Sequence, residues 1–215
     1  KDYVAVFKPN FAYFEVLGSS GVEVLKELIQ KIPQGIPVIG DAKRGDVGHT
    51  AQMYARSVFE TIGCDAVTVT PYQGEDALRP FFDYTDRGVF VLCLTSNPGA
   101  VDFQLPDLHL QVAKKVQEWN VSGNAGLVVG ATRSDKIAAV RKISGQMPFL
   151  IPGVGSQRGE LKNTLLFAED GSKIPYLINA SRSILYASSG EDFAQQAGNA
   201  AKELRDQINL CRSFL

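Results

Sequence analysis

The stretch Ile39-Gly40-Asp41-Ala42-Lys43-Arg44-Gly45-Asp46-Val47-Gly48 places charged residues directly after a short apolar run that begins at Pro37. The apolar run is typical of a buried strand, and the charged residues follow at its C-terminal end. In parallel α/β proteins, side chains leave the core and face a ligand at that end of a strand. Asp41 and Lys43 are two residues apart, so both can project to the same side. The stretch therefore predicts a charged site at the mouth of an α/β fold.

Lys43 lies between two acidic residues, Asp41 and Asp46. Nearby negative charge favours the protonated ammonium, which suits Lys43 to donating a proton and not to acting as an amine nucleophile. Lys8 follows the apolar run 4–7 and would add a second ammonium to the same pocket. The alternative is a structural salt-bridge network at the rim of the fold, because such networks occur without any catalytic role.

Short apolar or β-branched runs alternate with helical patterns along the chain, which is typical of repeated βα units and a parallel sheet. The expected strands are 4–7, 38–40, 66–70, 89–94, 126–129, 149–151 and 176–179. The expected helices are 21–31, 50–61, 74–82, 108–119, 134–143, 159–167 and 191–211. All connections are short, so we expect residues 1–215 to form a single domain.

The regular alternation favours a (β/α)8 TIM barrel over an open doubly wound sheet. A closed barrel of this kind needs eight strands, whereas the pattern predicts seven and starts directly on one of them. We therefore expect the first strand of the barrel to be missing from this chain.

Two late loops carry anion-binding chemistry. The loop Pro152-Gly153-Val154-Gly155-Ser156-Gln157 opens a helix, and its glycines let backbone N–H groups approach an anion. The loop Asn179-Ala180-Ser181-Arg182-Ser183 adds a guanidinium, which binds phosphate through paired donors. Each loop alone could be an ordinary turn, but TIM barrels frequently bind phosphate after their last two strands. A third loop, Thr95-Ser96-Asn97-Pro98-Gly99, is either a plain turn or a set of neutral contacts for a base or sugar.

Composition excludes several classes of function. The 22 basic and 23 acidic residues give a net charge of −1 with no basic run, so nucleic acid is not an expected partner. No apolar run approaches the roughly 18 residues of a membrane span. Three widely spaced cysteines suit reduced thiols and a cytoplasmic protein. We expect His49 at a helix start and His109 at the surface.

Taken together, the motifs resemble the orotidine 5'-monophosphate decarboxylase family, in its bacterial-type branch. The resemblance rests on the segment 41–50, preceded by Phe7-Lys8-Pro9 and followed by the three loops above, and it spans nearly the whole chain. It implies conversion of orotidine 5'-monophosphate to uridine 5'-monophosphate in pyrimidine biosynthesis, with no cofactor and no metal. The aspartate that the family usually carries at the end of its first strand has no counterpart here.

The resemblance also implies roles for individual residues. Lys43 would deliver a proton to the carbon that loses the carboxylate, Asp41 would lie against the departing carboxylate, and Lys8 would hold Asp41 and a ribose hydroxyl. In a homodimer, Asp46 and Thr50 would reach into the active site of the other subunit. The remaining substrate contacts would be Ser96 at the pyrimidine and Gln157 and Arg182 at the phosphate, with Pro152, Gly155 and Ser183 in the same loops.

Two other functions remain open from the sequence. A Mg²⁺-dependent sugar-phosphate lyase of the same barrel suprafamily would use Asp41 and Asp46 to bind or flank the metal. A non-catalytic barrel that binds a phosphate ligand would use the charged cluster only to orient that ligand.

Overall fold

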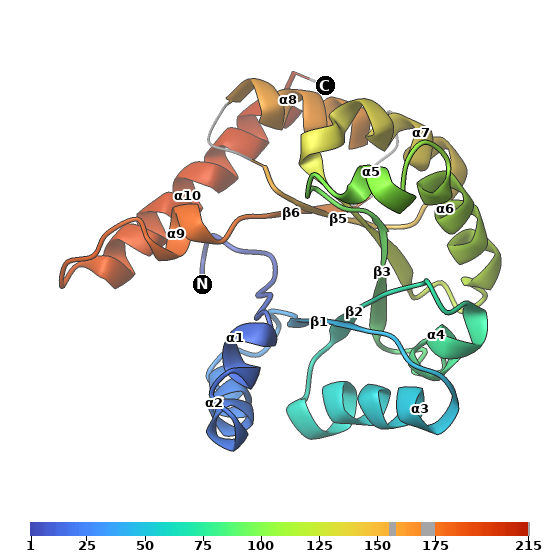
Figure 1. The fold of residues 1–215 in the computed structure, drawn as a ribbon. Coiled ribbons are helices and arrows are strands. Elements are labelled where there is room, and N and C mark those ends of the chain that lie inside the picture. The colour runs from blue at the N-terminus through green and yellow to red at the C-terminus, as the bar shows by residue number, and fades with distance from the viewer. Residues whose placement is uncertain (155–157, 169–174, 215) are drawn as a thin grey trace.

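The computed structural model describes residues 1–154, 158–168 and 175–214. Six parallel strands form one sheet whose order follows the chain. They are β1 (Ile39–Arg44), β2 (Ala66–Val69), β3 (Gly88–Leu94), β4 (Ala125–Val129), β5 (Phe149–Pro152) and β6 (Tyr176–Asn179). A doubly wound sheet reverses its strand order at a switch point, and these six strands show no reversal. The sheet instead curls with helices on its outer side, as in a TIM barrel (Figure 1).

All seven expected helices are present within a few residues of their predicted bounds. The helices are α1 (Ala12–Glu15), α2 (Ser19–Gln30), α3 (Gly48–Arg56), α4 (Glu75–Phe82), α5 (Ala100–Phe103), α6 (Leu108–Trp119), α7 (Ser134–Ser144), α8 (Arg158–Ala168), α9 (Arg182–Leu185) and α10 (Phe193–Arg212). A π-helix, η1 (Ser57–Ile62), continues α3, and a 3₁₀ turn, η2 (Ala131–Arg133), precedes α7. The unexpected helices α1, α5 and α9 have four residues each, too few to show a helical period. Among the described residues, no helix has the length and apolar character needed to cross a membrane.

The first expected strand, residues 4–7, is not a strand in the structure. Residues 4–10 meet Val38 and β1 only through two isolated parallel bridges, one from Phe7 to Val38 and one from Asn10 to Asp41. Pro9 lies between the bridges, and it has no N–H group to extend a ladder. The segment still runs beside β1, which brings Lys8 to the charged stretch.

Two apolar layers flank the sheet. The outer layer packs the strands against the helices and includes Val67 and Phe81, which are fully buried. The inner layer fills the concave side of the sheet and consists of Ile39, Ala66, Phe90, Val128 and Leu150, with Val6, Leu92 and Leu177 packed against them. Asp41 accepts a hydrogen bond from Thr68, which is on the same side of β2 as Ala66, and Lys43 Nζ contacts Asp41, so both charged side chains lie on the side of Ile39. The charged stretch therefore faces the mouth of the barrel.

The end of β1 is irregular. Gly40 pairs with Val67 and Arg44 with Val69, so three residues of β1 lie opposite one residue of β2. Within this bulge, Lys43 has a φ of 47°, in the left-handed region that residues other than glycine rarely adopt. The expected strand ended at Gly40, before the bulge. Bulges of this kind re-aim side chains and are frequent next to active sites.

Candidate active site

Asp41 is the centre of the charged cluster. Its carboxylate accepts a hydrogen bond from Lys8 Nζ at Oδ2 and another from Lys43 Nζ at Oδ1, both at 2.5 Å. The Asp41 side chain is 8% exposed and that of Lys8 16%, whereas the Lys43 side chain is 48% exposed. The cluster thus has a buried end at Lys8 and Asp41 and an open end at Lys43.

Two opposing effects act on the pKa of Asp41. Burial of the carboxyl group raises its pKa, but the positive charge of Lys8 and the hydrogen bonds from Lys43 and Lys8 outweigh burial. The net result is a pKa below the ordinary value of 3.8. Asp41 is therefore an anion at neutral pH, and it holds two ammonium groups at the mouth of the barrel.

A threonine completes the cluster. Thr68, in β2, donates from its hydroxyl to Asp41 Oδ1 at 2.9 Å and accepts from the backbone N–H of Lys43 at 3.0 Å. Thr68 is 1% exposed. Thr68 is not among the site residues predicted from the sequence, because a β-branched residue inside a strand carries no functional signal of its own. Its place opposite the bulge of β1 becomes visible only once the two strands are paired.

Asp46 and Thr50 lie beyond the end of β1. The Asp46 carboxylate accepts from the backbone N–H of Val47 at 2.8 Å, and within the described part of the chain it has no ion pair. Thr50 is exposed in the first turn of α3. The neighbouring Arg44 is engaged elsewhere, by Glu15 and by the ring of Tyr54. The structure thus separates Asp46 and Thr50 from the contacts that bind the Lys8–Asp41–Lys43 cluster.

Ser96 lies where several strand ends meet. A Cβ atom at Gly130, which follows β4, would lie 2.7 Å from the Ser96 backbone N. One at Gly153, which follows β5, would lie 3.4 Å from Ser96 Oγ. Only glycine permits such a close approach at Gly130, since real Cβ contacts are longer. The loops after β3 and β5, which the sequence proposed as parts of one binding site, are therefore in contact.

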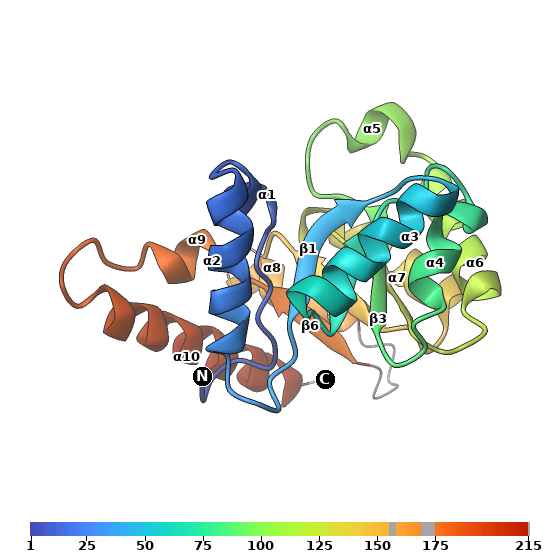
Figure 2. The same cartoon turned by 90° about the horizontal axis from the view of Figure 1, so that it is seen from below.

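Gln104 closes the loop that carries Ser96. Its side-chain oxygen accepts from the Thr95 backbone N–H at 2.7 Å, and its Nε2 donates to Thr95 Oγ1 at 2.8 Å. The Gln104 carbonyl in turn accepts from His109 Nδ1 at 2.9 Å. The expectation of a surface His109 is wrong, because its side chain is only 2% exposed. His109 lies on the buried face of α6, together with Ala113 and Val116, and is hydrogen-bonded to this loop. The loop and α5 project beyond the C-terminal end of β1 (Figure 2).

The proposed phosphate residues lie after the last two strands. Pro152 ends β5 and pairs in register with Asn179, which ends β6. Arg182 and Ser183 begin α9 and are both exposed. Gly155 and Gln157, which the sequence assigned to the same site, lie outside the described residues.

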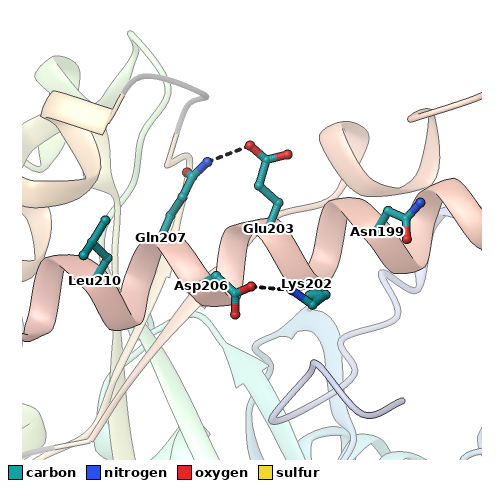
Figure 3. A pocket seen from close by; sticks show the side chains of 6 residues that line it. All are labelled: Asn199, Lys202, Glu203, Asp206, Gln207 and Leu210. Atoms are coloured by element: carbon teal, nitrogen blue, oxygen red, sulfur yellow. Dashed lines mark hydrogen bonds and ion pairs between the residues drawn. The ribbon is translucent and has the colours of Figure 1, made fainter.

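The described part of the chain offers little support for a metal site or for a ligand site elsewhere. No group of three metal-ligating side chains occurs within the described ranges, and Asp41, the best candidate, already holds two ammonium groups. A hollow of about 350 Å³ lies along α10 and is lined only by residues of that helix (Figure 3). Its polar side chains are paired with one another, Lys202 with Asp206 and Gln207 with Glu203. The charged cluster is therefore the candidate active site.

The structure shows a curled parallel sheet with a cluster of two ammonium groups and one carboxylate at the C-terminal end of a strand. This arrangement is typical of a TIM-barrel protein with its ligand site at the carboxyl ends of the strands. Residues 1–197 match the model of the "Orotidine 5'-phosphate decarboxylase / HUMPS family". The chain belongs to this family, and the expected fold class and resemblance are confirmed.

Individual proteins that are similar to this chain carry the name of the same family. An orotidine 5'-phosphate decarboxylase of Dehalococcoides mccartyi is 48% identical over 219 residues, covering 98% of this chain and 81% of the relative. One from Roseiflexus castenholzii is 49% identical, covering 97% and 79%. The solved structure of Leishmania donovani OMP decarboxylase superposes with a TM-score of 0.87 at 43% identity, covering 98% of this chain and 82% of that one.

Proposed function

We propose that this protein decarboxylates orotidine 5'-monophosphate to uridine 5'-monophosphate, with Lys43 as the proton donor. The observation that carries the proposal is the pair of 2.5 Å contacts that fix two ammonium groups on one buried carboxylate at the barrel mouth. The family model alone also covers other activities. The relatives at 48% and 49% identity, both named as the decarboxylase, favour this one.

Decarboxylation requires stabilisation of the negative charge that develops on one ring carbon of the substrate. When the bond to the carboxylate breaks, CO₂ leaves and the electron pair stays on that carbon, which then takes a proton from Lys43 Nζ. Two unit charges about 4 Å apart interact by roughly 4 kcal/mol at an effective dielectric constant near 20. Such an interaction accelerates the reaction only if it is stronger in the transition state than in the bound substrate. Lys43 meets the condition because the negative charge grows on the atom it faces, and its exposed end can regain a proton from water.

Asp41 and Lys8 prepare the site for this step. Asp41 is ionised, so it would repel the substrate carboxylate and would hold Lys43 in place. Lys8 balances the charge of Asp41 from the buried side and would also reach a ribose hydroxyl. Without Lys8, the buried carboxylate would lose half of its compensating charge.

The rest of the substrate would bind along the strand ends. We assign Ser96 to the pyrimidine and Arg182 to the phosphate, with Pro152, Gly155, Gln157 and Ser183 in the adjoining loops. Among the described residues Arg182 has no ion pair, which leaves its guanidinium available to an anion. Binding energy from the phosphate would hold the strained carboxylate against Asp41.

We also propose a homodimer with shared active sites. Asp46 and Thr50 would complete the site of the partner subunit, which fits the finding that Asp46 makes no ion pair with any described residue of its own chain. Exposed apolar side chains lie in or directly after α1 and in the loop after β2. Tyr13 is 75% exposed, Val16 79% and Tyr72 83%. Apolar surface of this kind is typical of interfaces between subunits.

A cytoplasmic location is part of the proposal. The three cysteines are free, and Cys64 and Cys93 are buried. Burial raises the pKa of both thiols to about 12, so they stay protonated and unreactive. Free thiols suit a reducing compartment.

Ultraviolet absorbance after addition of orotidine 5'-monophosphate tests the function directly, in buffer with and without a chelator. We expect loss of the substrate spectrum at the same rate in both. Activity that stops with the chelator would support the Mg²⁺-dependent lyase instead. Binding of uridine 5'-monophosphate without any turnover would support the non-catalytic barrel.

A further inference from the structure

We propose that Thr68 is a positioning residue for the decarboxylation, whose single hydroxyl group fixes Lys43 at both of its ends. The inference rests on the proposed function, which assigns the transferred proton to Lys43. Thr68 belongs to none of the motifs that the sequence singled out.

The hydroxyl of Thr68 is used twice. It donates to Asp41 Oδ1 at 2.9 Å, the same oxygen that accepts from Lys43 Nζ at 2.5 Å. It also accepts from the Lys43 backbone N–H at 3.0 Å. A hydroxyl group has one proton and two lone pairs, so it makes both bonds at once. Thr68 therefore contacts the backbone of Lys43 directly and its ammonium through Asp41.

The bulge of β1 explains why this position needs a hydroxyl. Between Gly40 and Arg44 the ladder to β2 is interrupted, so the Lys43 N–H has no backbone acceptor on the neighbouring strand. The Thr68 side chain takes the place of that missing acceptor. Lys43 also holds a left-handed φ of 47°, a strained conformation that persists only where its surroundings enforce it.

Thr68 lies on the inner side of the sheet. Val67 and Val69, its neighbours in β2, pack into the outer layer, whereas Ala66, two residues away, lies in the inner core. At 1% exposure, Thr68 is sealed beneath the cluster and has no access to a substrate. Its effect on the reaction must therefore pass through Asp41 and Lys43.

Without the hydroxyl, two groups lose a partner. One lone pair of the buried Asp41 carboxylate and the partly buried Lys43 N–H would lose their partner, and the strained turn at Lys43 would relax. A displacement of about 1 Å of a reacting group can lower the rate roughly a hundredfold. Because the phosphate and pyrimidine contacts lie on other loops, substrate binding should change little.

The test compares kcat and KM for orotidine 5'-monophosphate in Thr68→Ser, Thr68→Cys and Thr68→Val. Serine keeps the hydroxyl, cysteine has nearly the size of serine but a weak hydrogen-bonding thiol, and valine keeps the shape of threonine. We expect kcat to fall at least about tenfold in the cysteine and valine variants and less than about threefold in the serine variant. KM should stay within about threefold in all three, as for an interaction that acts on the transition state.

Thr164 provides the matched control. It is a fully buried threonine in α8 whose hydroxyl has no hydrogen-bond partner among the described residues. Thr164→Val should leave kcat unchanged. Melting temperatures of all variants separate a change in stability from a change in kcat.

A kcat within about twofold of wild type in both Thr68→Cys and Thr68→Val would overturn the inference, whatever the change in melting temperature. An equal loss in Thr68→Ser and Thr68→Cys would also overturn it, since the methyl group and not the hydroxyl would then matter. The serine and cysteine pair decides the question even if the valine variant does not fold. A wild-type protein that releases no CO₂ would instead overturn the proposed function.

Discussion

Asp41 is the residue on which the charges of the site converge. Its lowered pKa means that it stabilises the fold as an anion. The stabilisation is fully present above the ordinary value of 3.8 and is lost as the pH falls through the lower pKa of the folded state. Lys8 is the largest of the influences that lower this pKa, and burial opposes them.

Replacing Lys8 should therefore make the fold less stable to acid. In Lys8→Met the raising effect of burial remains and the main lowering effect is gone, so the pKa of Asp41 rises. We expect the acid-unfolding midpoint to move to higher pH and the free energy of unfolding at pH 7 to fall by about 1–3 kcal/mol. Chemical denaturation between pH 3 and pH 7 measures both.

Lys26→Met serves as the control for that comparison. Lys26 pairs with Glu23 on the surface of α2 at 3.5 Å, a contact of little energetic value. Removing this ion pair should leave the acid-unfolding midpoint unchanged. An identical pH dependence in Lys8→Met and wild type would contradict the role given to Lys8.

The residues of the charged cluster could be predicted because their signal is local. Asp41 and Lys43 are two apart at the end of an apolar run, and alternation places them on one side of a strand. Thr68 could not be predicted, since its role depends on the pairing of β1 with β2 and on a bulge. His109 was misplaced because a histidine in an amphipathic helix fits either face until the packing of that helix is known.

The loop from Thr95 to Gln104 is the element whose shape depends most on one side chain. Gln104 makes hydrogen bonds to both the backbone and the hydroxyl of Thr95, directly before Ser96. We expect Gln104→Leu to loosen this loop and to raise KM for orotidine 5'-monophosphate about tenfold, with a smaller effect on kcat. Steady-state kinetics measure the two parameters separately.

Gln111→Leu is the matched control for this loop. Gln111 is an exposed glutamine on α6, and its side chain should tolerate the change. If Gln104→Leu and Gln111→Leu give the same KM as wild type, the loop does not depend on Gln104, or Ser96 does not contact the substrate.

At the level of elements, six of the seven expected strands are present, with ends that differ by a few residues. The misses have physical causes. Residues 4–7 satisfy the apolar pattern, but this part of the chain forms only two isolated bridges, Phe7 to Val38 and Asn10 to Asp41, with Pro9 between them. The expected helix 50–61 contains a change to π-helix at Ser57, which hydrophobic spacing does not reveal.

The whole molecule adds the prediction of a shared active site. Lys43→Ala and Asp46→Ala should each be inactive, but their mixture should regain activity if the two residues come from different subunits. At equal amounts and full exchange, half of the dimers are mixed and each carries one intact site, so about a quarter of the wild-type activity is expected.

A mixture of Lys43→Ala with Asp41→Ala is the control, because both residues belong to the same half of the site. It should stay inactive. If neither mixture recovers after subunit exchange has been verified, for example by mass spectrometry of differently labelled subunits, Asp46 does not act across an interface.

The barrel as a whole was predictable from the regular βα alternation and from the phosphate signals after the last two strands. The convergence of the Ser96 loop with Gly130 and Gly153 was not, because it depends on how adjacent strand ends approach in space. This convergence places the proposed pyrimidine contact beside one of the proposed phosphate loops.

The most direct test is the rate of CO₂ release from orotidine 5'-monophosphate by Lys43→Ala, measured beside its affinity for uridine 5'-monophosphate. We expect CO₂ release to fall by at least about four powers of ten while the nucleotide still binds within about tenfold of wild type. A Lys43→Ala protein that decarboxylates at the wild-type rate would contradict the assignment of Lys43 as the proton donor.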